Sequence, residues 1–108
     1  MQREYILVLT TTATEQQAAQ FARGLVESRL AACVHIDTVR SIYRWQGAVP
    51  DEPEWQLAIK TTPARYVEVE QFIKAHHTYD TPEILCIDIA GGAADYLRWI
   101  DACVGNAD

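Results

Sequence analysis

Hydrophobic positions along the chain follow the period of strands in some segments and of helices in others, and their order predicts seven elements. Residues 5–9 (YILVL) form a continuous apolar run, which is typical of a strand covered on both faces and central in its sheet. A helix follows to about residue 30, because Thr14 and Gln17 form a capping box. Its apolar positions recur at helical spacing: Ala18, Phe21, Ala22, Leu25, Val26 and Leu30.

The middle of the chain predicts a long β-hairpin. Residues 32–46 (ACVHIDTVRSIYRWQ) are dense in β-branched and aromatic side chains and hold neither Gly nor Pro, so they predict one unusually long strand. Residues 47–53 carry one Gly, two prolines and two acids, which is the composition of a turn. Residues 54–61 then alternate polar and apolar positions and predict the partner strand, with Trp55, Leu57 and Ile59 on one face.

The last third of the chain predicts a helix, a strand and a short helix. Thr62 followed by Pro63 marks a helix start, and this helix should end near His76. Its apolar stripe consists of Tyr66, Val69 and Ile73. Residues 84–90 (ILCIDIA) predict a fourth strand, and residues 91–92 open a final helix. One side of that helix carries Leu97, Ile100 and Val104.

This element order predicts an α+β fold of the ferredoxin-like sandwich type. Two split β-α-β units (βαββαβ) plus a C-terminal helix give a four-stranded antiparallel sheet with both main helices on one face. A chain of 108 residues is long enough for one ordinary domain only. We therefore expect a single domain over residues 1–108.

The predicted hairpin is longer than the helices that could cover it. A strand over residues 32–46 spans about 50 Å, whereas the first helix covers only about 25 Å. The uncovered part carries Ile42, Tyr43, Trp45 and Trp55. If these side chains stay exposed to water on a two-stranded ribbon, the ribbon is only marginally stable and has an aggregation-prone edge. We therefore expect self-association through the hairpin; the alternative is that the ribbon curls back over its own sheet.

Composition and charge exclude several classes of function. The chain is 49% hydrophobic and 22% charged, with a net charge of −6, and a surface of that sign repels the phosphate backbone of nucleic acids. The N-terminal apolar run is too short for a signal peptide or a membrane span, so we expect a cytoplasmic protein. Three cysteines without a C-x-x-C motif indicate reduced thiols, and we expect Cys33 and Cys86 to pack in the core.

Candidate chemistry is concentrated after the second predicted helix, where His76 and His77 precede the polar segment 78–83. Imidazoles bind copper and zinc well, but adjacent helical residues point about 100° apart and chelate one ion less readily than an i, i+4 pair. The alternative is that the histidines only complement the helix dipole. The two serines, Ser28 and Ser41, stand beside neither a histidine nor a glycine elbow.

These residues leave an enzyme as the least favoured interpretation. An acid–base pair of His77 with Glu83 or Asp80 is conceivable, but histidine and carboxylate often lie close together without catalysis. We therefore expect no enzymatic activity.

Five segments fall in the order and spacing of the CutA divalent-cation tolerance proteins, which the chain resembles over nearly its whole length. They are LAACVHI (30–36), SIYRWQG (41–47), AIKTT (58–62), HHTYDTPEI (76–84) and YLRWI (96–100). The resemblance implies a ferredoxin-like protomer, a homotrimer built through the long hairpins, and a cytosolic protein that takes part in the response to copper and other divalent metal ions.

The resemblance also implies site residues. Members of the family have a hairpin motif that Tyr43, Trp45 and Gly47 match, and a cleft between neighbouring subunits whose lining Lys60, His77, Tyr79, Pro82 and Glu83 match. His76 and His77 match a histidine pair proposed as copper ligands, which some members complete with a cysteine at the end of the first strand. Thr10 stands at that position here, so a hydroxyl replaces a soft thiolate ligand.

Two hypotheses of different class result. The first is a trimeric protein that binds copper or another divalent ion through His76 and His77, with Glu83 as a further candidate ligand. The second is a regulatory trimer, similar to the PII signalling proteins in fold and assembly, whose inter-subunit cleft takes a small anionic ligand at Lys60 and Tyr79.

Overall fold

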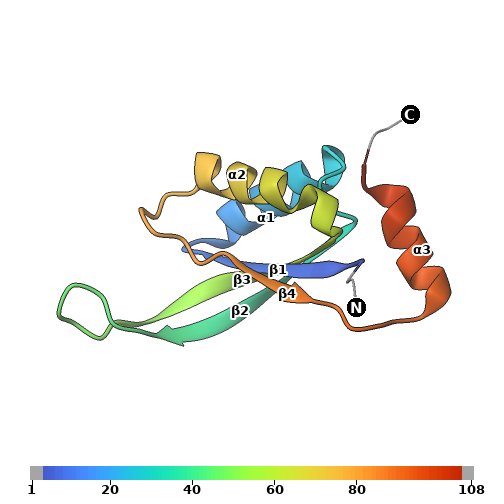
Figure 1. Ribbon diagram of the computed structural model, residues 1–108. Helices are drawn as coiled ribbons and strands as arrows, with labels where there is room; N and C mark the ends of the chain where they lie inside the picture. The colour runs from blue at the N-terminus through green and yellow to red at the C-terminus, as the bar shows by residue number, and fades with distance from the viewer. Residues whose placement is uncertain (1–3, 106–108) are drawn as a thin grey trace.

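Four antiparallel strands form one sheet, two helices lie across one of its faces, and a third helix stands at one end (Figure 1). The computed structural model describes residues 4–105; residues 1–3 and 106–108 of the predicted domain lie outside this range. The elements are β1 (Ile6–Thr12), α1 (Glu15–Glu27), β2 (Cys33–Ile42), β3 (Asp51–Thr61), a 3-10 turn (Pro63–Arg65), α2 (Tyr66–His76), β4 (Leu85–Asp88) and α3 (Ala94–Cys103). The strand order β2-β3-β1-β4 places β1 inside the sheet, as predicted, and the ferredoxin-like arrangement is confirmed.

Helix α1 begins where the sequence predicts and ends earlier. The hydroxyl oxygen of Thr14 accepts a hydrogen bond from the Gln17 backbone N–H at 3.1 Å, which satisfies one of the free donors at the helix start. The helix ends at Glu27, three residues before the predicted end, and Arg29 then adopts a φ of 63°. A right-handed helix does not continue through this left-handed conformation.

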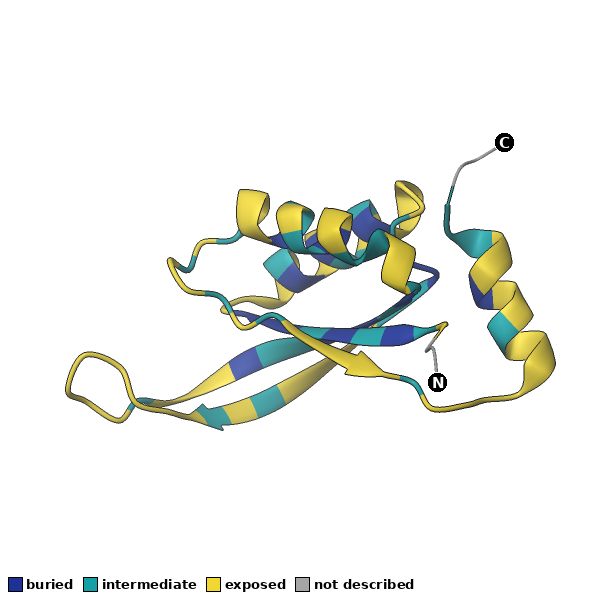
Figure 2. Ribbon diagram, in the orientation of Figure 1, coloured by how far each residue is buried: buried dark blue, intermediate teal, exposed yellow. Residues whose placement is uncertain are grey.

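The hydrophobic core lies between the helices and the sheet (Figure 2). Both helices and the two inner strands contribute side chains that are almost fully buried: Phe21 and Leu25 from α1, Val69 and Ile73 from α2, Ile6 and Val8 from β1, and Leu57 and Ile59 from β3. Burial of each such side chain stabilises the fold by about 2 kcal/mol. The apolar stripes predicted for both helices therefore face the core, except that Val26 of the first stripe is 41% exposed.

The hairpin extends to a tight turn at Gln46 and Gly47. Both residues have positive φ (49° and 80°), as the two central residues of a type I′ turn do, and Trp45 and Ala48 exchange backbone hydrogen bonds of 3.0 Å across it. The regular part of β2 ends at Ile42, and Asp51–Pro53, predicted as turn, belong to β3. Pro53 is compatible with this strand because β3 pairs there with β2 alone.

The outer half of the hairpin extends beyond the helices, and the described part of the chain measures 46 × 27 × 21 Å (Figure 1). Its side chains are exposed as predicted: Ile42 is 62%, Tyr43 39% and Trp45 46% exposed. The prediction was wrong for Trp55, which pairs with Thr12 at the end of β1 and packs against the core.

The last two elements differ from the sequence prediction in extent and burial. Strand β4 covers four residues, all exposed, where seven were predicted. Cys86 therefore lies on the surface, and its predicted place in the core was wrong. Helix α3 begins at Ala94, two residues after the glycines. Its buried side chain, Ile100, is 1% exposed. The hydroxyl of Tyr5, the residue before β1, donates a hydrogen bond of 2.5 Å to Asp101 of α3.

Candidate functional site

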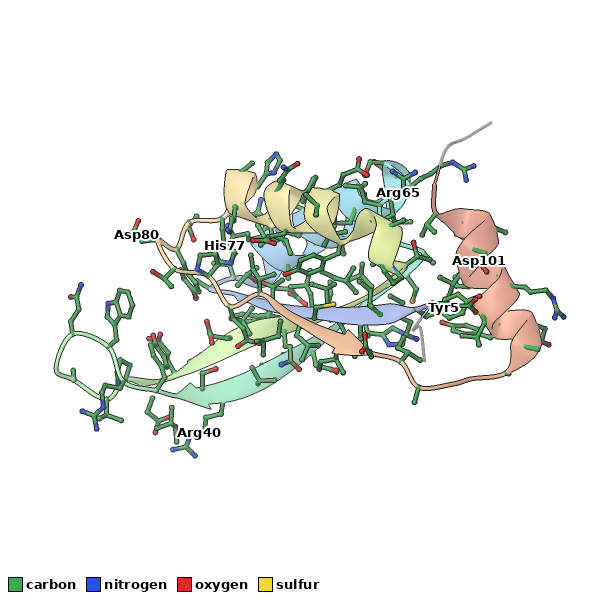
Figure 3. All side chains as sticks on the ribbon, viewed as in Figure 1. Tyr5, Arg40, Arg65, His77, Asp80 and Asp101 are labelled. Carbon is green, nitrogen blue, oxygen red and sulfur yellow. The ribbon has the colours of Figure 1, made fainter. Side chains whose placement is uncertain are left out.

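A cavity of about 620 Å³ opens between the outer half of the hairpin and the loop that follows α2. Two segments supply most of its lining. The hairpin contributes residues 40–43, Trp45 and Glu54, and the loop contributes residues 79–81 and Glu83, with Thr11 completing the set, whereas the predicted cleft residues His77 and Pro82 are not part of it. In Figure 3, Arg40 lies on the hairpin and Asp80 on the loop across from it. We call this cavity the hairpin cleft. It brings together four of the predicted site residues: Tyr43, Trp45, Tyr79 and Glu83.

Glu54 provides a buried carboxylate in the hairpin cleft. The residue as a whole is only 8% exposed. Ser41 donates a hydrogen bond of 2.6 Å to one carboxylate oxygen, and the Tyr79 hydroxyl donates one of 2.8 Å to the other. Burial, together with the hydrogen bond to Glu54 and its negative charge, raises the pKa of Tyr79 far above the ordinary value of 10. Tyr79 is therefore a neutral donor at physiological pH.

Two further pairs fix the walls of the hairpin cleft. The Tyr43 hydroxyl donates a hydrogen bond to Glu52, which raises the pKa of Tyr43. The Arg40 guanidinium binds both carboxylate oxygens of Asp51, at 2.8 and 2.7 Å, and this bidentate contact lowers the pKa of Asp51. The charge of Arg40 is thus already paired.

His77 lies beneath the end of α2 with both ring nitrogens in use (Figure 3). The Tyr79 backbone N–H donates to Nδ1 at 3.0 Å, so Nδ1 carries the lone pair and Nε2 carries the proton. Nε2 in turn donates to the Thr11 carbonyl at 2.7 Å. The ring also packs against Phe21 and Tyr79, with centroid separations of 5.5 and 4.6 Å. In this arrangement His77 has no free lone pair for a metal ion.

His76 differs from its neighbour because it is exposed at the end of α2. Its Nδ1 lies 2.8 Å from the Phe72 carbonyl, which can only accept, so Nδ1 donates. Nε2 of the neutral ring is then left with a free lone pair. Among residues 4–105, no three His, Cys, Asp or Glu side chains are grouped as ligands for one metal ion.

Comparison with known proteins identifies the family. The chain matches the CutA1 divalent ion tolerance proteins over residues 6–103. The chain belongs to this family. It is 44% identical to a divalent-cation tolerance protein CutA of Thermus thermophilus over 87% of this chain and 92% of that protein. It is 37% identical to the CutA protein of Pectobacterium atrosepticum over 90% and 89%.

Solved structures of CutA1 proteins share the fold. The Thermus thermophilus protein superposes with a TM-score of 0.89 at 42% identity, over 94% of this chain and 99% of the other. CutA1 from the psychrotrophic bacterium Shewanella superposes with a TM-score of 0.93 at 34% identity, over 98% and 100%. The chain is therefore a divalent-cation tolerance protein of the CutA family in sequence and in fold.

Lys60 is the one predicted cleft residue of this CutA chain that lies far from the others in the sheet. It pairs with Leu7 and Cys33 at the opposite end of β3 from Glu54. Its ammonium group donates a hydrogen bond of 3.0 Å to the Tyr96 hydroxyl and lies 5.2 Å from the centre of that ring. Within one chain, Lys60 and Tyr79 therefore do not form a joint anion site.

Thr10, for which the resemblance implies a cysteine in some members, is fully buried in β1. Its hydroxyl oxygen makes no hydrogen bond within the described part of the chain. Position 10 therefore offers a sheltered hydroxyl in place of a soft metal ligand.

Sequence reasoning missed Glu54 and Ser41, which are hydrogen-bonded to each other in the lining of the hairpin cleft. The alternation of β3 placed Glu54 on the polar face, which is the ordinary position of an exposed carboxylate. It is buried because the loop that carries Tyr79 folds back over it.

No helix among the described residues is long and apolar enough to span a membrane.

Proposed function

We propose that the protein is a cytoplasmic, non-enzymatic homotrimer that binds divalent metal ions, copper among them, as part of the response to these ions. Membership of a divalent-cation tolerance family over residues 6–103 is the observation that carries this proposal. The exposed apolar side chains at the end of the hairpin support self-assembly, because a surface of this kind is stabilised when a second chain covers it.

For the metal, we propose His76 as the ligand from this chain. His76 is exposed and its Nε2 makes no hydrogen bond within residues 4–105, whereas His77 uses both ring nitrogens to hold Thr11 and Tyr79. One imidazole binds Cu(II) weakly by itself, so the remaining positions are filled by water or by groups of a neighbouring chain.

Copper titration of single histidine variants tests this assignment. We expect His76→Ala to weaken Cu(II) binding at least tenfold by isothermal titration calorimetry, because it removes the free nitrogen. His35→Ala is the matched control, since His35 is exposed on β2, and it should bind copper as the parent does. Parental affinity in His76→Ala would contradict the assignment.

His77→Ala separates a ligand from a structural residue. We expect this variant to keep its copper affinity while losing about 2 kcal/mol of unfolding free energy, because the Thr11 carbonyl and the Tyr79 N–H lose their partner. Urea denaturation measures that loss. If His77→Ala instead loses copper binding at unchanged stability, His77 is the ligand.

A further inference from the structure

The Glu54 carboxylate in the hairpin cleft lacks a positive partner in its own chain. Glu54 is more than nine-tenths buried, and its two hydrogen-bond donors, Ser41 and Tyr79, are neutral. No ion pair within the described part of the chain includes it. Arg40, the one basic residue of the cavity lining, already binds both carboxylate oxygens of Asp51. Because burial of an ionised carboxylate is costly unless a positive charge compensates it, a cation from outside the chain would stabilise Glu54.

Lys60, on the same strand, carries a positive charge that no carboxylate of its own chain binds. Its ammonium group donates to the Tyr96 hydroxyl at 3.0 Å and lies 5.2 Å from the centre of that ring. Both contacts are with a neutral side chain, and none of the ion pairs among residues 4–105 includes Lys60. Strand β3 therefore holds one carboxylate and one ammonium group that lack a partner of opposite charge.

Glu54 and Lys60 lie on one face of the sheet but at opposite ends of it. Successive side chains of a strand point to opposite faces, so residues six positions apart share a face. Leu57 and Ile59, between them, belong to the core under the helices, so Glu54 and Lys60 face away from the helices. Six positions correspond to about 20 Å. The two ends are those of the hairpin and of α3, which lie at opposite ends of the molecule in Figure 1. One chain therefore cannot pair these two charges.

A second copy of the chain satisfies both groups at once. The sheet face carries the Lys60 ammonium group at its α3 end and the Glu54 carboxylate at its hairpin end, where Asp80 and Glu83 also line the cavity. When identical chains meet head to tail in a closed ring, the α3 end of each chain can meet the hairpin end of the next. Complementary charges then determine which surfaces dock and in which orientation.

We propose that Lys60 of one chain enters the hairpin cleft of the next chain and binds the Glu54 carboxylate there, so that a neighbouring chain completes each cleft. This pairing rests on the proposed homotrimer, which then holds three such pairs. Ser41 and Tyr79 hold the carboxylate in place, and each of its oxygens retains capacity for a further donor. The new contact is a charge-assisted hydrogen bond between chains.

A double-mutant cycle on assembly tests the ion pair. Lys60→Met leaves the Glu54 carboxylate enclosed without a cation, so we expect its trimer to dissociate at a protein concentration at least tenfold higher than the parent trimer does. Glu54→Gln keeps the shape of the side chain and removes its charge. The variant with both changes should assemble at least tenfold more tightly than Lys60→Met alone, because no buried charge is left unpaired. Analytical ultracentrifugation of the full chain, at a urea concentration that partly dissociates the parent trimer, measures all four proteins.

Matched controls make the same two changes on the outer helices. Lys74→Met and Glu27→Gln each break an i, i+4 ion pair on the helix surface. Exposed pairs of this kind contribute little, so both variants should assemble as the parent does. The coupling between Lys60 and Glu54 should also persist from about 0.01 to 0.15 M salt, because salt screens an enclosed pair much less than exposed charges.

The possible results separate failure of the ion pair from failure of the trimer. Additive effects of Lys60→Met and Glu54→Gln in a trimeric parent would overturn the ion pair and leave the trimer intact, because residues about 20 Å apart in one chain do not couple. Assembly of Lys60→Met at the parental concentration would also overturn it. A parent that sediments as a single chain of 12.2 kDa at every concentration would overturn the proposed trimer and this pair together.

Discussion

Tyr79 links the hairpin cleft to the pH dependence of stability. Its pKa in the folded chain is raised by burial and by Glu54, so the folded state holds the phenolic proton more tightly than the unfolded chain, whose tyrosines titrate near 10. For a pKa raised on folding, the stabilisation is fully present below pH 10 and is lost as pH rises above it. We expect the unfolding free energy to fall above about pH 10.

Tyr79→Phe checks this expectation. The variant should lose about 1 kcal/mol at neutral pH, because Glu54 loses one donor, and its stability should then decline less steeply above pH 10 than that of the parent. Urea denaturation at a series of pH values measures both effects. Tyr5, whose pKa is raised to about 12 by its hydrogen bond to Asp101, should account for part of the remaining slope. Identical slopes in parent and variant would show that Tyr79 is not the titrating group.

At the level of single residues, the family resemblance singled out side chains that the fold brings together, but it did not predict their hydrogen bonds. It singled out Tyr43, Trp45, Tyr79 and Glu83, which the fold gathers around one cavity. It treated His76 and His77 as equivalent, yet their hydrogen bonds differ, because His77 faces the end of β1 and its neighbour faces solvent. His77 contacts Thr11, which is 66 positions away in the sequence. The spacing of neighbouring residues does not predict a contact of this kind.

At the level of elements, packing of α1 against α2 depends on Gly24. A Cβ at this position would lie 2.7 Å from the ring of Phe72, and that ring is held by an edge-to-face contact with Phe21 at 6.1 Å and by His76 at 4.5 Å. Gly24→Ala gains about 1 kcal/mol in helix propensity, but the crowding outweighs this gain. We expect a net loss of about 1–2 kcal/mol in unfolding free energy.

A double variant shows whether crowding causes that loss. Phe72→Leu makes room beside α1, so the Gly24→Ala change should become neutral or stabilising in its presence. Thermal or urea unfolding of the four proteins in the cycle yields the coupling free energy. A stabilising Gly24→Ala change in the parent background would indicate that the Phe72 ring moves aside freely.

The sequence predicted element types well and element ends less well, for reasons that differ between elements. The periodic spacing of hydrophobic residues correctly predicted α1, α2 and the core face of β3. The turn was misplaced because 50–53 has the composition of a loop, while the hairpin projects from the sheet and tolerates Pro53 on its unpaired side. The apolar run 84–90 predicted a strand with Cys86 in the core, but β4 lies at the sheet edge and remains exposed within one chain.

For the whole molecule, the hairpin and the net charge act in opposite directions on the proposed assembly. Ile42, Trp45 and Val49 expose 62%, 46% and 60% of their surface near the hairpin end, which favours contact with another chain. Each chain also carries a charge of −6, so three chains carry about −18 and repel one another. The net stability of the trimer therefore depends on how far salt screens this repulsion.

Sedimentation equilibrium at two salt concentrations tests this balance. The Debye length falls from roughly 30 Å at 0.01 M salt to about 8 Å at 0.15 M, so added salt weakens the repulsion while the apolar contact persists. We expect a species of about 37 kDa, three times the 12.2 kDa of one chain, to form at lower protein concentration in the higher salt. Ile42→Ser should weaken assembly at both concentrations, because it removes apolar surface without changing the charge. Weaker assembly in high salt would mean that ion pairs between chains, rather than the hairpin contact, hold the trimer together, and a 12 kDa species at micromolar concentration under both conditions would contradict the trimer.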